Sequence, residues 1–122
     1  MEKSLRKDLK DLFLKVLCSV FRRQECITVL RLVKIVRIVL MVDLSGVDLD
    51  EDEVFRELCS LGTEGFLNFF EDRYGRVLVR PSLKLLTMCF QEYCNNKDLD
   101  NIISTLLTLN NKQLNKCTAL LN

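Results

Sequence analysis

Residues that form tight turns are scarce in this chain. Its 122 residues include only four glycines and one proline. An all-β sandwich or barrel needs many tight turns, and those turns draw heavily on glycine and proline. Leu, Ile, Val and Phe supply 47 residues, enough for a sizeable core and too many for a disordered or collagen-like chain. The sequence therefore predicts a single, mostly helical domain over residues 1–122.

The spacing of the apolar residues predicts where the helices lie. Apolar side chains recur at steps of three and four between Leu5 and Val20, which indicates an amphipathic helix over 3–22. The segment 27–42 is the most apolar, but Arg31, Lys34 and Arg37 interrupt it. Charges three residues apart share one side of a helix and alternate sides on a strand, so we expect a core helix with an exposed basic stripe and no membrane span.

Further helices are predicted over 50–61, 64–72, 82–94, 99–109 and 112–121. The first begins with a run of acidic residues, which a helix N-terminus favours, and Gly62 is placed just beyond its end. Thr63 is then the expected cap of the next helix. The segment 73–81 fits either a loop or half of a β-hairpin. The expected fold is an all-α, compact six- to seven-helix bundle. A short β-hairpin near 73–80 is the alternative that the sequence also allows for that segment.

Opposite charges are concentrated in different parts of the chain. Residues 1–40 carry ten basic and four acidic side chains, whereas residues 41–74 carry two and ten. The formal net charge is only +1, which does not suggest a protein that neutralises many phosphates. Segregated charge instead favours contact between a basic face of one copy and an acidic face of another.

The sequence offers no recognisable catalytic or metal-binding motif. It contains no histidine, so neither a histidine general base nor a mixed Cys/His zinc site is available. None of the six cysteines forms a C-x-x-C pair, and no phosphate-binding glycine motif occurs. We expect a non-enzyme without cofactor or metal. The charged N-terminus shows no secretory signal, which predicts a cytoplasmic protein with reduced cysteines.

Residues 66–103 carry a family resemblance. The motifs are, in chain order, Glu71-Asp72, Gly75-Arg76-Val77, Pro81-x-Leu83 and Asp98-Leu99. The segment resembles the second half of a death-effector domain, a six-helix module of the death-fold superfamily. Asn96 departs from the family, which has Arg at that place. A thinner similarity to a Bcl-2-type helix pair, in 70–77, points to the same biology.

The resemblance implies a non-catalytic adaptor or inhibitor that regulates apoptotic signalling through homotypic helical packing. The expected protein-binding residues are Arg31, Lys34, Arg37, Asp98 and Leu99, with the acidic partner surface at 50–53. The partner would be another protein or a second copy, and we expect a homo-oligomer that does not engage membranes.

A second interpretation treats the same region as part of a winged helix. The predicted helices 50–61 and 64–72 would form a helix-turn-helix, followed by a wing in which Arg73, Arg76 and Arg80 contact phosphates. The acidic residues of the second helix disfavour DNA, so this would be either a DNA-binding regulator or a dimerisation protein. A third possibility is a viral or archaeal accessory protein of no recognisable family.

Overall fold

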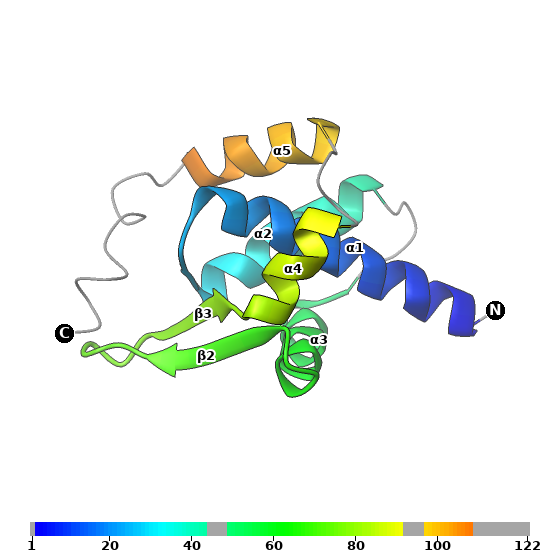
Figure 1. The fold of residues 1–122 in the computed structure, drawn as a ribbon. Coiled ribbons are helices and arrows are strands. Elements are labelled where there is room, and N and C mark those ends of the chain that lie inside the picture. The colour runs from blue at the N-terminus through cyan, green and yellow to red at the C-terminus, as the bar shows by residue number, and fades with distance from the viewer. Residues whose placement is uncertain (1, 44–48, 92–96, 109–122) are drawn as a thin grey trace.

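The computed structural model describes residues 2–43, 49–91 and 97–108 (Figure 1). Helices form most of this part of the chain, and three short strands form one antiparallel sheet. In chain order the elements are α1 (Glu2–Arg23), β1 (Ile27–Thr28), α2 (Val29–Asp43), α3 (Glu51–Thr63), β2 (Leu67–Glu71), β3 (Val77–Pro81), α4 (Leu83–Gln91) and α5 (Lys97–Thr108).

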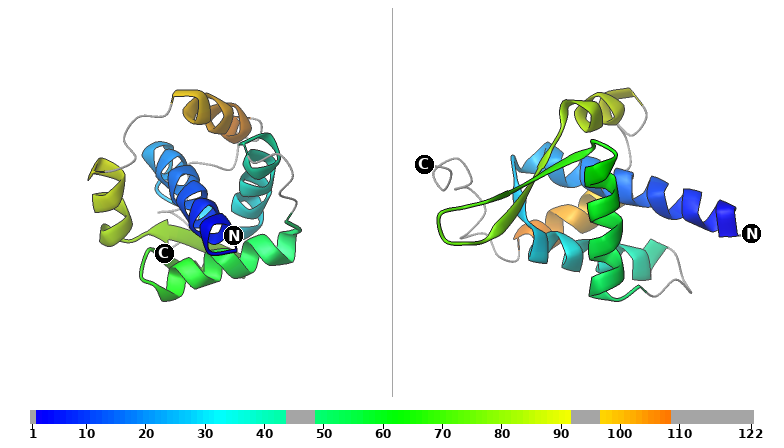
Figure 2. Two further views of the ribbon diagram at one scale, coloured as in Figure 1. Left: turned by 90° about the vertical axis from the view of Figure 1, so that its right-hand side faces the viewer. Right: turned by 90° about the horizontal axis from the view of Figure 1, so that it is seen from below.

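Helix α1 lies at the centre of the helical body. Seen end-on in Figure 2, left, it is surrounded by α5, α2, α3 and α4. Every residue from Leu12 to Phe21 except Lys15 is buried, as expected for a helix covered on all sides. The buried Ser19 satisfies its hydroxyl by donating to Asp100 Oδ1 at 2.5 Å. The helix predicted over 3–22 is therefore confirmed, and it forms the middle of the core.

A hairpin replaces one of the predicted helices. Strand β3 is the middle strand of the sheet and pairs with β1 on one side and β2 on the other, in the order β1-β3-β2. The register places Phe69 opposite Val79 and Ile27 opposite Val79. Figure 1 and Figure 2, right, show the far end of the β2–β3 hairpin reaching away from the helices.

The all-α bundle predicted from the sequence is therefore wrong, and so is the helix over 64–72. Phe66, Leu67, Phe69 and Phe70 are spaced as on one side of a helix, which is why the local pattern favours a helix here. Pairing with 77–81 decides for the strand: β3 contains the β-branched residues Val77 and Val79 and supplies backbone partners for 67–71. The β-hairpin that the sequence allowed near 73–80 is present, and β3 is its second strand. The helix predicted over 112–121 lies outside the described residues.

Gly62 lies inside α3 and not beyond its end. A Cβ atom at this position would come within 2.6 Å of Phe69 Cε2, closer than van der Waals contact allows. Glycine thus lets the last turn of α3 approach β2 directly. Thr63 is the last residue of α3, and its hydroxyl donates to the Cys59 carbonyl oxygen at 3.1 Å, so it does not cap a following helix.

Two of the cysteines expected to be reduced form a disulfide. Cys18 on α1 and Cys89 on α4 are bonded, with their Cα atoms 5.4 Å apart. Cys26 is disulfide-bonded as well, whereas Cys59 is free. The apolar neighbours of Cys18 and Cys89 reflect their place in the core and do not determine their redox state. The bridge attaches α4, which follows the hairpin, to the central helix.

None of the helices described is long and apolar enough to cross a membrane. The charges at 31, 34 and 37 interrupt the apolar run of α2, as the sequence indicates.

Candidate functional site

Helix α3 presents an acidic face. Asp50 caps its N-terminus by accepting from the Glu53 backbone N–H at 2.8 Å, and Glu53 Oε1 accepts from the Asp50 N–H at 3.2 Å. This reciprocal capping box explains why the helix begins at this acidic run. The exposed side chains of α3 include four carboxylates and one basic group, Arg56. They are Glu51, Asp52, Glu53, Phe55, Arg56, Glu57, Ser60 and Thr63.

The turn between β2 and β3 is organised by one carboxylate. The side chain of Asp72 has no exposed surface. Its Oδ1 accepts from the backbone N–H groups of Tyr74 and Arg76 at 2.8 and 2.9 Å. Its Oδ2 accepts from Arg76 Nε at 2.8 Å. Gly75 donates its N–H to the Asp72 carbonyl oxygen and has φ +80°, which completes a three-residue hairpin loop.

These bonds also set the titration of Asp72. Burial by itself raises the pKa of the carboxyl group. The hydrogen bonds from the backbone and side chain of Arg76 and from the Tyr74 backbone, with the positive charge of Arg76, act in the other direction and hold the pKa of Asp72 below its ordinary value. The tip of the hairpin is therefore a preformed structure at neutral pH.

The three arginines predicted for a wing do lie on one hairpin, but they are not equivalent. Arg76 is ion-paired with Asp72. Arg80 lies over the Phe70 ring, with 4.9 Å between its Cζ and the ring centroid. Arg73 is exposed beside Tyr74, with 6.0 Å from Cζ to the ring centroid. Tyr74 itself is 66% exposed.

The basic residues predicted on α2 are largely engaged within the fold. Arg31 Nη2 donates to the carbonyl oxygens of Leu106 and Leu107 at 3.3 and 2.8 Å, near the C-terminus of α5. Burial lowers the pKa of the Arg31 guanidinium. Arg37 Nε donates to the Leu49 carbonyl oxygen at 3.0 Å. Of these three residues, Lys34 is exposed, whereas Arg31 and Arg37 are partly buried and hydrogen-bonded to carbonyl groups. The predicted basic stripe is therefore not continuously exposed.

The other two predicted protein-binding residues are separated from that stripe. Asp98 lies in the first turn of α5, where the helix dipole favours an acidic side chain, and it is exposed. Leu99 is 3% exposed and belongs to the core. Arg31 contacts the opposite end of α5. The structure therefore does not bring Asp98 and Leu99 together with Arg31 in one surface. Asn96 lies outside the described residues.

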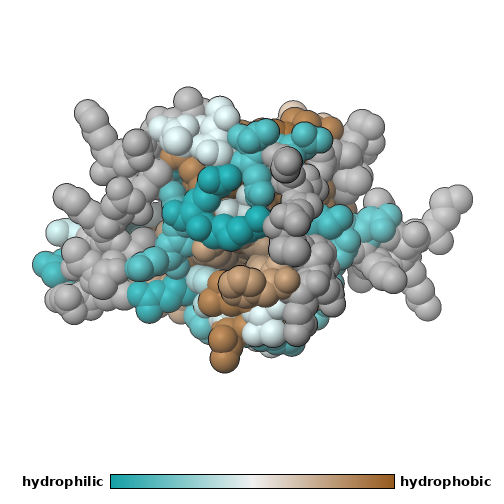
Figure 3. All heavy atoms as spheres, turned by 45° about the horizontal axis from the view of Figure 1, so that its top comes forward, coloured by the Kyte–Doolittle hydropathy of each residue, from teal (hydrophilic) through white to brown (hydrophobic). Residues whose placement is uncertain are grey.

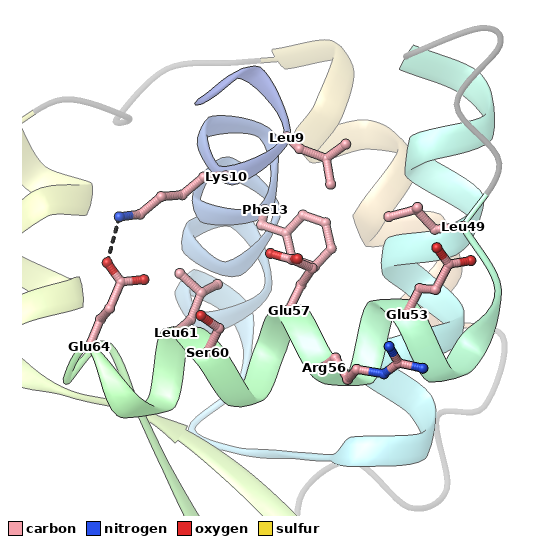
Figure 4. A pocket seen from close by; sticks show the side chains of 10 residues that line it. All are labelled: Leu9, Lys10, Phe13, Leu49, Glu53, Arg56, Glu57, Ser60, Leu61 and Glu64. Atoms are coloured by element: carbon pink, nitrogen blue, oxygen red, sulfur yellow. Dashed lines mark hydrogen bonds and ion pairs between the residues drawn. The ribbon is translucent and has the colours of Figure 1, made fainter. Parts of the chain in front are cut away.

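Sequence reasoning missed a pocket between α1 and α3. Its volume is about 450 Å³. Figure 4 shows Leu9 and Phe13 reaching into it from α1, while Lys10 and Glu64 close one end with an ion pair at 2.6 Å. The complete lining is Leu9, Lys10, Phe13, Leu49, Glu53, Arg56, Glu57, Ser60, Leu61 and Glu64. No local pattern indicates this pocket, because its two walls are separated by about forty residues of chain.

Large apolar side chains also reach the surface. Leu83 and Phe90 on α4 are 80% and 83% exposed, and Leu30 on α2 is 74% exposed. Figure 3 shows apolar side chains at the surface of the face that it displays, bordered by hydrophilic ones. Leu83 and Phe90 are seven residues apart on α4 and therefore lie on the same side of that helix, and adjoining exposed apolar side chains commonly mark surfaces that bind other proteins.

Within the described part of the chain, no three His, Cys, Asp or Glu side chains are grouped so as to hold a metal ion. Comparison with known proteins finds no relative: no protein-family model, no curated protein and no solved structure matches this chain. The segment that resembles a death-effector domain contains the hairpin in place of the helix that the likeness requires. Apoptotic regulation was implied only through that helical bundle, so the fold gives it no support.

Proposed function

We propose that the chain is a winged-helix module that acts by binding protein, including copies of itself, and not by reading DNA. The order helix, strand, two helices and hairpin, with a sheet ordered β1-β3-β2, supports the winged-helix assignment. In this assignment α2 and α3 are the helix-turn-helix and the β2–β3 hairpin is the wing. The helix-turn-helix considered from sequence was therefore displaced by one helix along the chain.

The charge of α3 is the observation that carries the proposal. In a DNA-binding helix-turn-helix, the second helix enters the major groove and lies between two phosphate backbones. Here that helix exposes Glu51, Asp52, Glu53 and Glu57 against one arginine. Carboxylates in this position repel phosphates, and basic side chains supply most of the affinity of such complexes. Leu83 and Phe90, on the same side of α4, offer exposed apolar surface to a protein partner instead.

Two measurements on the purified chain test this proposal. Sedimentation velocity over a range of protein concentrations should show self-association. Titration of a fluorescent DNA duplex at low salt should show no saturable binding. A chain that stays monomeric and binds duplex DNA, with an affinity that falls steeply as salt rises, would contradict the proposal.

The wing supports a second candidate function, contact with nucleic acid through the hairpin alone. Arg73 is exposed, Arg80 is half-buried, and Tyr74 offers a ring on which a base can stack. Replacing Arg73 and Arg80 by Ala should then abolish any binding of single-stranded nucleic acid at low salt. Equal binding by the variant and the native chain would exclude this candidate.

A cytoplasmic location stays part of the proposal. The Cys18–Cys89 disulfide is a constraint on it, because such bonds persist in the cytosol chiefly in hyperthermophiles. Alkylation of cysteines in intact source cells, followed by mass spectrometry, would show whether the bridge exists in place. If Cys18 and Cys89 are fully reduced in those cells, the result supports a location in a reducing cytosol.

A further inference from the structure

The α1–α3 pocket combines an apolar floor with an acidic rim. Leu9, Phe13, Leu49 and Leu61 supply the apolar surface. Lys10 is neutralised by its ion pair with Glu64. The rim then retains the carboxylates of Glu53 and Glu57 against the single guanidinium of Arg56. A pocket of this chemistry suits a group that joins an aromatic or aliphatic body to a positive charge.

The tip of the hairpin is a group of that kind. Tyr74 is 66% exposed, and Arg73 beside it forms no ion pair among the described residues. The Asp72 hydrogen bonds hold the loop in one conformation before any partner arrives. Little conformational entropy is therefore lost on binding. Tyr and Arg are also the residue types that most often dominate the energy of protein interfaces.

From this complementarity we infer that the chain associates with itself by placing the Arg73-Tyr74 tip of one copy in the α1–α3 pocket of another. The inference rests on the proposed protein-binding function and names its partner. Residues 50–64 carry six acidic side chains and one basic one, whereas the hairpin residues 67–81 carry three arginines and two acids, one of which, Asp72, is paired with Arg76. The ring of Tyr74 meets the apolar floor, and Arg73 meets Glu57 and Glu53.

The two surfaces of this contact are different, so each copy carries one tip and one pocket. Contacts between two different surfaces form a closed ring, a reciprocal dimer or an open head-to-tail chain. They also allow a complementation test, which a contact between two identical patches would not allow. Two copies that are each damaged in a different surface can still bind each other through the pair of surfaces that remains intact.

The test uses two charge reversals, Arg73→Glu on the tip and Glu57→Arg in the pocket. Both side chains are exposed, so the fold should tolerate the changes. Each variant alone should raise the dissociation constant for self-association roughly tenfold or more, because attraction becomes repulsion. An equimolar mixture of the two should associate again, since the native tip of one fits the native pocket of the other. Recovery in the mixture also shows that both variants are folded.

The matched control is Lys34→Glu, which changes the net charge as Arg73→Glu does but lies on α2. Sedimentation velocity at one concentration series compares all four samples with the native chain. Association that Lys34→Glu leaves intact and Arg73→Glu abolishes supports the tip-to-pocket contact. If Lys34→Glu abolishes self-association and Arg73→Glu does not, the contact involves α2, and the tip-to-pocket contact is overturned.

The remaining outcomes separate the inference from the function on which it rests. A native chain that associates, with neither Arg73→Glu nor Glu57→Arg weakening it, overturns the tip-to-pocket contact and leaves the protein-binding function standing. A native chain that is monomeric at every concentration overturns both. Association that weakens between about 0.05 and about 0.5 M salt, as expected for exposed charges, supports the contact.

Discussion

The arginines of the helical body and those of the hairpin have different surroundings. In the body, Arg31 and Arg37 on α2 donate to backbone carbonyl groups of other segments, and Arg22 on α1 pairs with Asp100 on α5. On the hairpin, Arg73 is exposed and Arg80 lies on an aromatic ring. Arg31 and Arg37 on α2 thus support the fold, as Arg76 does on the hairpin through its ion pair with Asp72, whereas Arg73 at the hairpin tip remains available to a partner.

This difference gives distinct expectations for substitutions in the two regions. Changes in the body should lower the free energy of global unfolding, because its side chains join elements far apart in the sequence. Changes at the tip of the hairpin should alter local opening or binding, since the far end of the hairpin reaches away from the helices. The variants below can confirm or contradict that division.

The largest effect is expected from removing the Cys18–Cys89 bridge by replacing both cysteines with Ala. The bridge spans a sequence separation of 71 residues. Loss of a loop of this size should lower the free energy of unfolding by about 4 kcal/mol in the chain-entropy account. Urea denaturation without reductant measures it, with Cys59→Ala, which removes a free thiol, as control. A loss no larger than that of the control would show that the bridge does not hold the body together.

Next in size is the effect of Arg31→Met, which removes the two hydrogen bonds to the C-terminal carbonyl groups of α5. Hydrogen bonds from a charged donor contribute about 2 kcal/mol, so unfolding should become easier by that order. Amide exchange of α5 should also become faster. Lys34→Met, on the same helix and exposed, should cost far less. Equal losses of unfolding free energy for the two variants would show that Arg31 stabilises the fold no more than the exposed Lys34 does.

A smaller and local effect is expected from Asp72→Asn. The variant loses the ion pair with Arg76 and weakens the bonds that shape the turn. Because the folded-state pKa of Asp72 is lowered, its contribution is present at neutral pH and is lost as the pH falls through the ordinary carboxyl range, about 4, and below. Amide exchange at Gly75 and Arg76 measures it. The native hairpin should approach the variant in acid, and a constant difference down to pH 2 would contradict the mechanism.

The smallest effect on stability is expected from Arg73→Ala. The side chain is exposed, and its interaction within residues 2–43, 49–91 and 97–108 is with the Tyr74 ring, so the free energy of unfolding should stay within about 0.5 kcal/mol of the native value. Thermal unfolding measures it. Arg76→Ala, which leaves the buried Asp72 without its side-chain partner, should cost more. A large loss for Arg73→Ala would show that Arg73, like Arg76, supports the fold.

Local patterns in the sequence predicted most of the helices. The periodic leucines of 3–22 mark α1, and the acidic start at 50–53 marks the beginning of α3 through its capping box. The charges at 31, 34 and 37 correctly indicated a helix over most of 27–42. Each of these signals depends on neighbours within one or two turns, so sequence is sufficient to read it.

The candidate site could be predicted only in part. Arg73, Arg76 and Arg80 were found because they flank a turn and belong to one short segment. The pocket was not found, since its walls come from residues 9–13 and 49–64. The sequence did not show that Arg31 and Arg37 are partly buried, because the carbonyl groups that accept their hydrogen bonds lie in other segments and leave no mark on the sequence.

The sequence by itself determined that this chain is mostly helical, where most of the described helices lie, and that its charges are segregated. Those properties follow from spacing and composition. Tertiary structure alone decided that 67–71 is a strand, that Cys18 meets Cys89, and which arginines are exposed. Each of these depends on a partner distant in the chain, and a strand, a bridge or a hydrogen bond is defined only when both of its ends are in place.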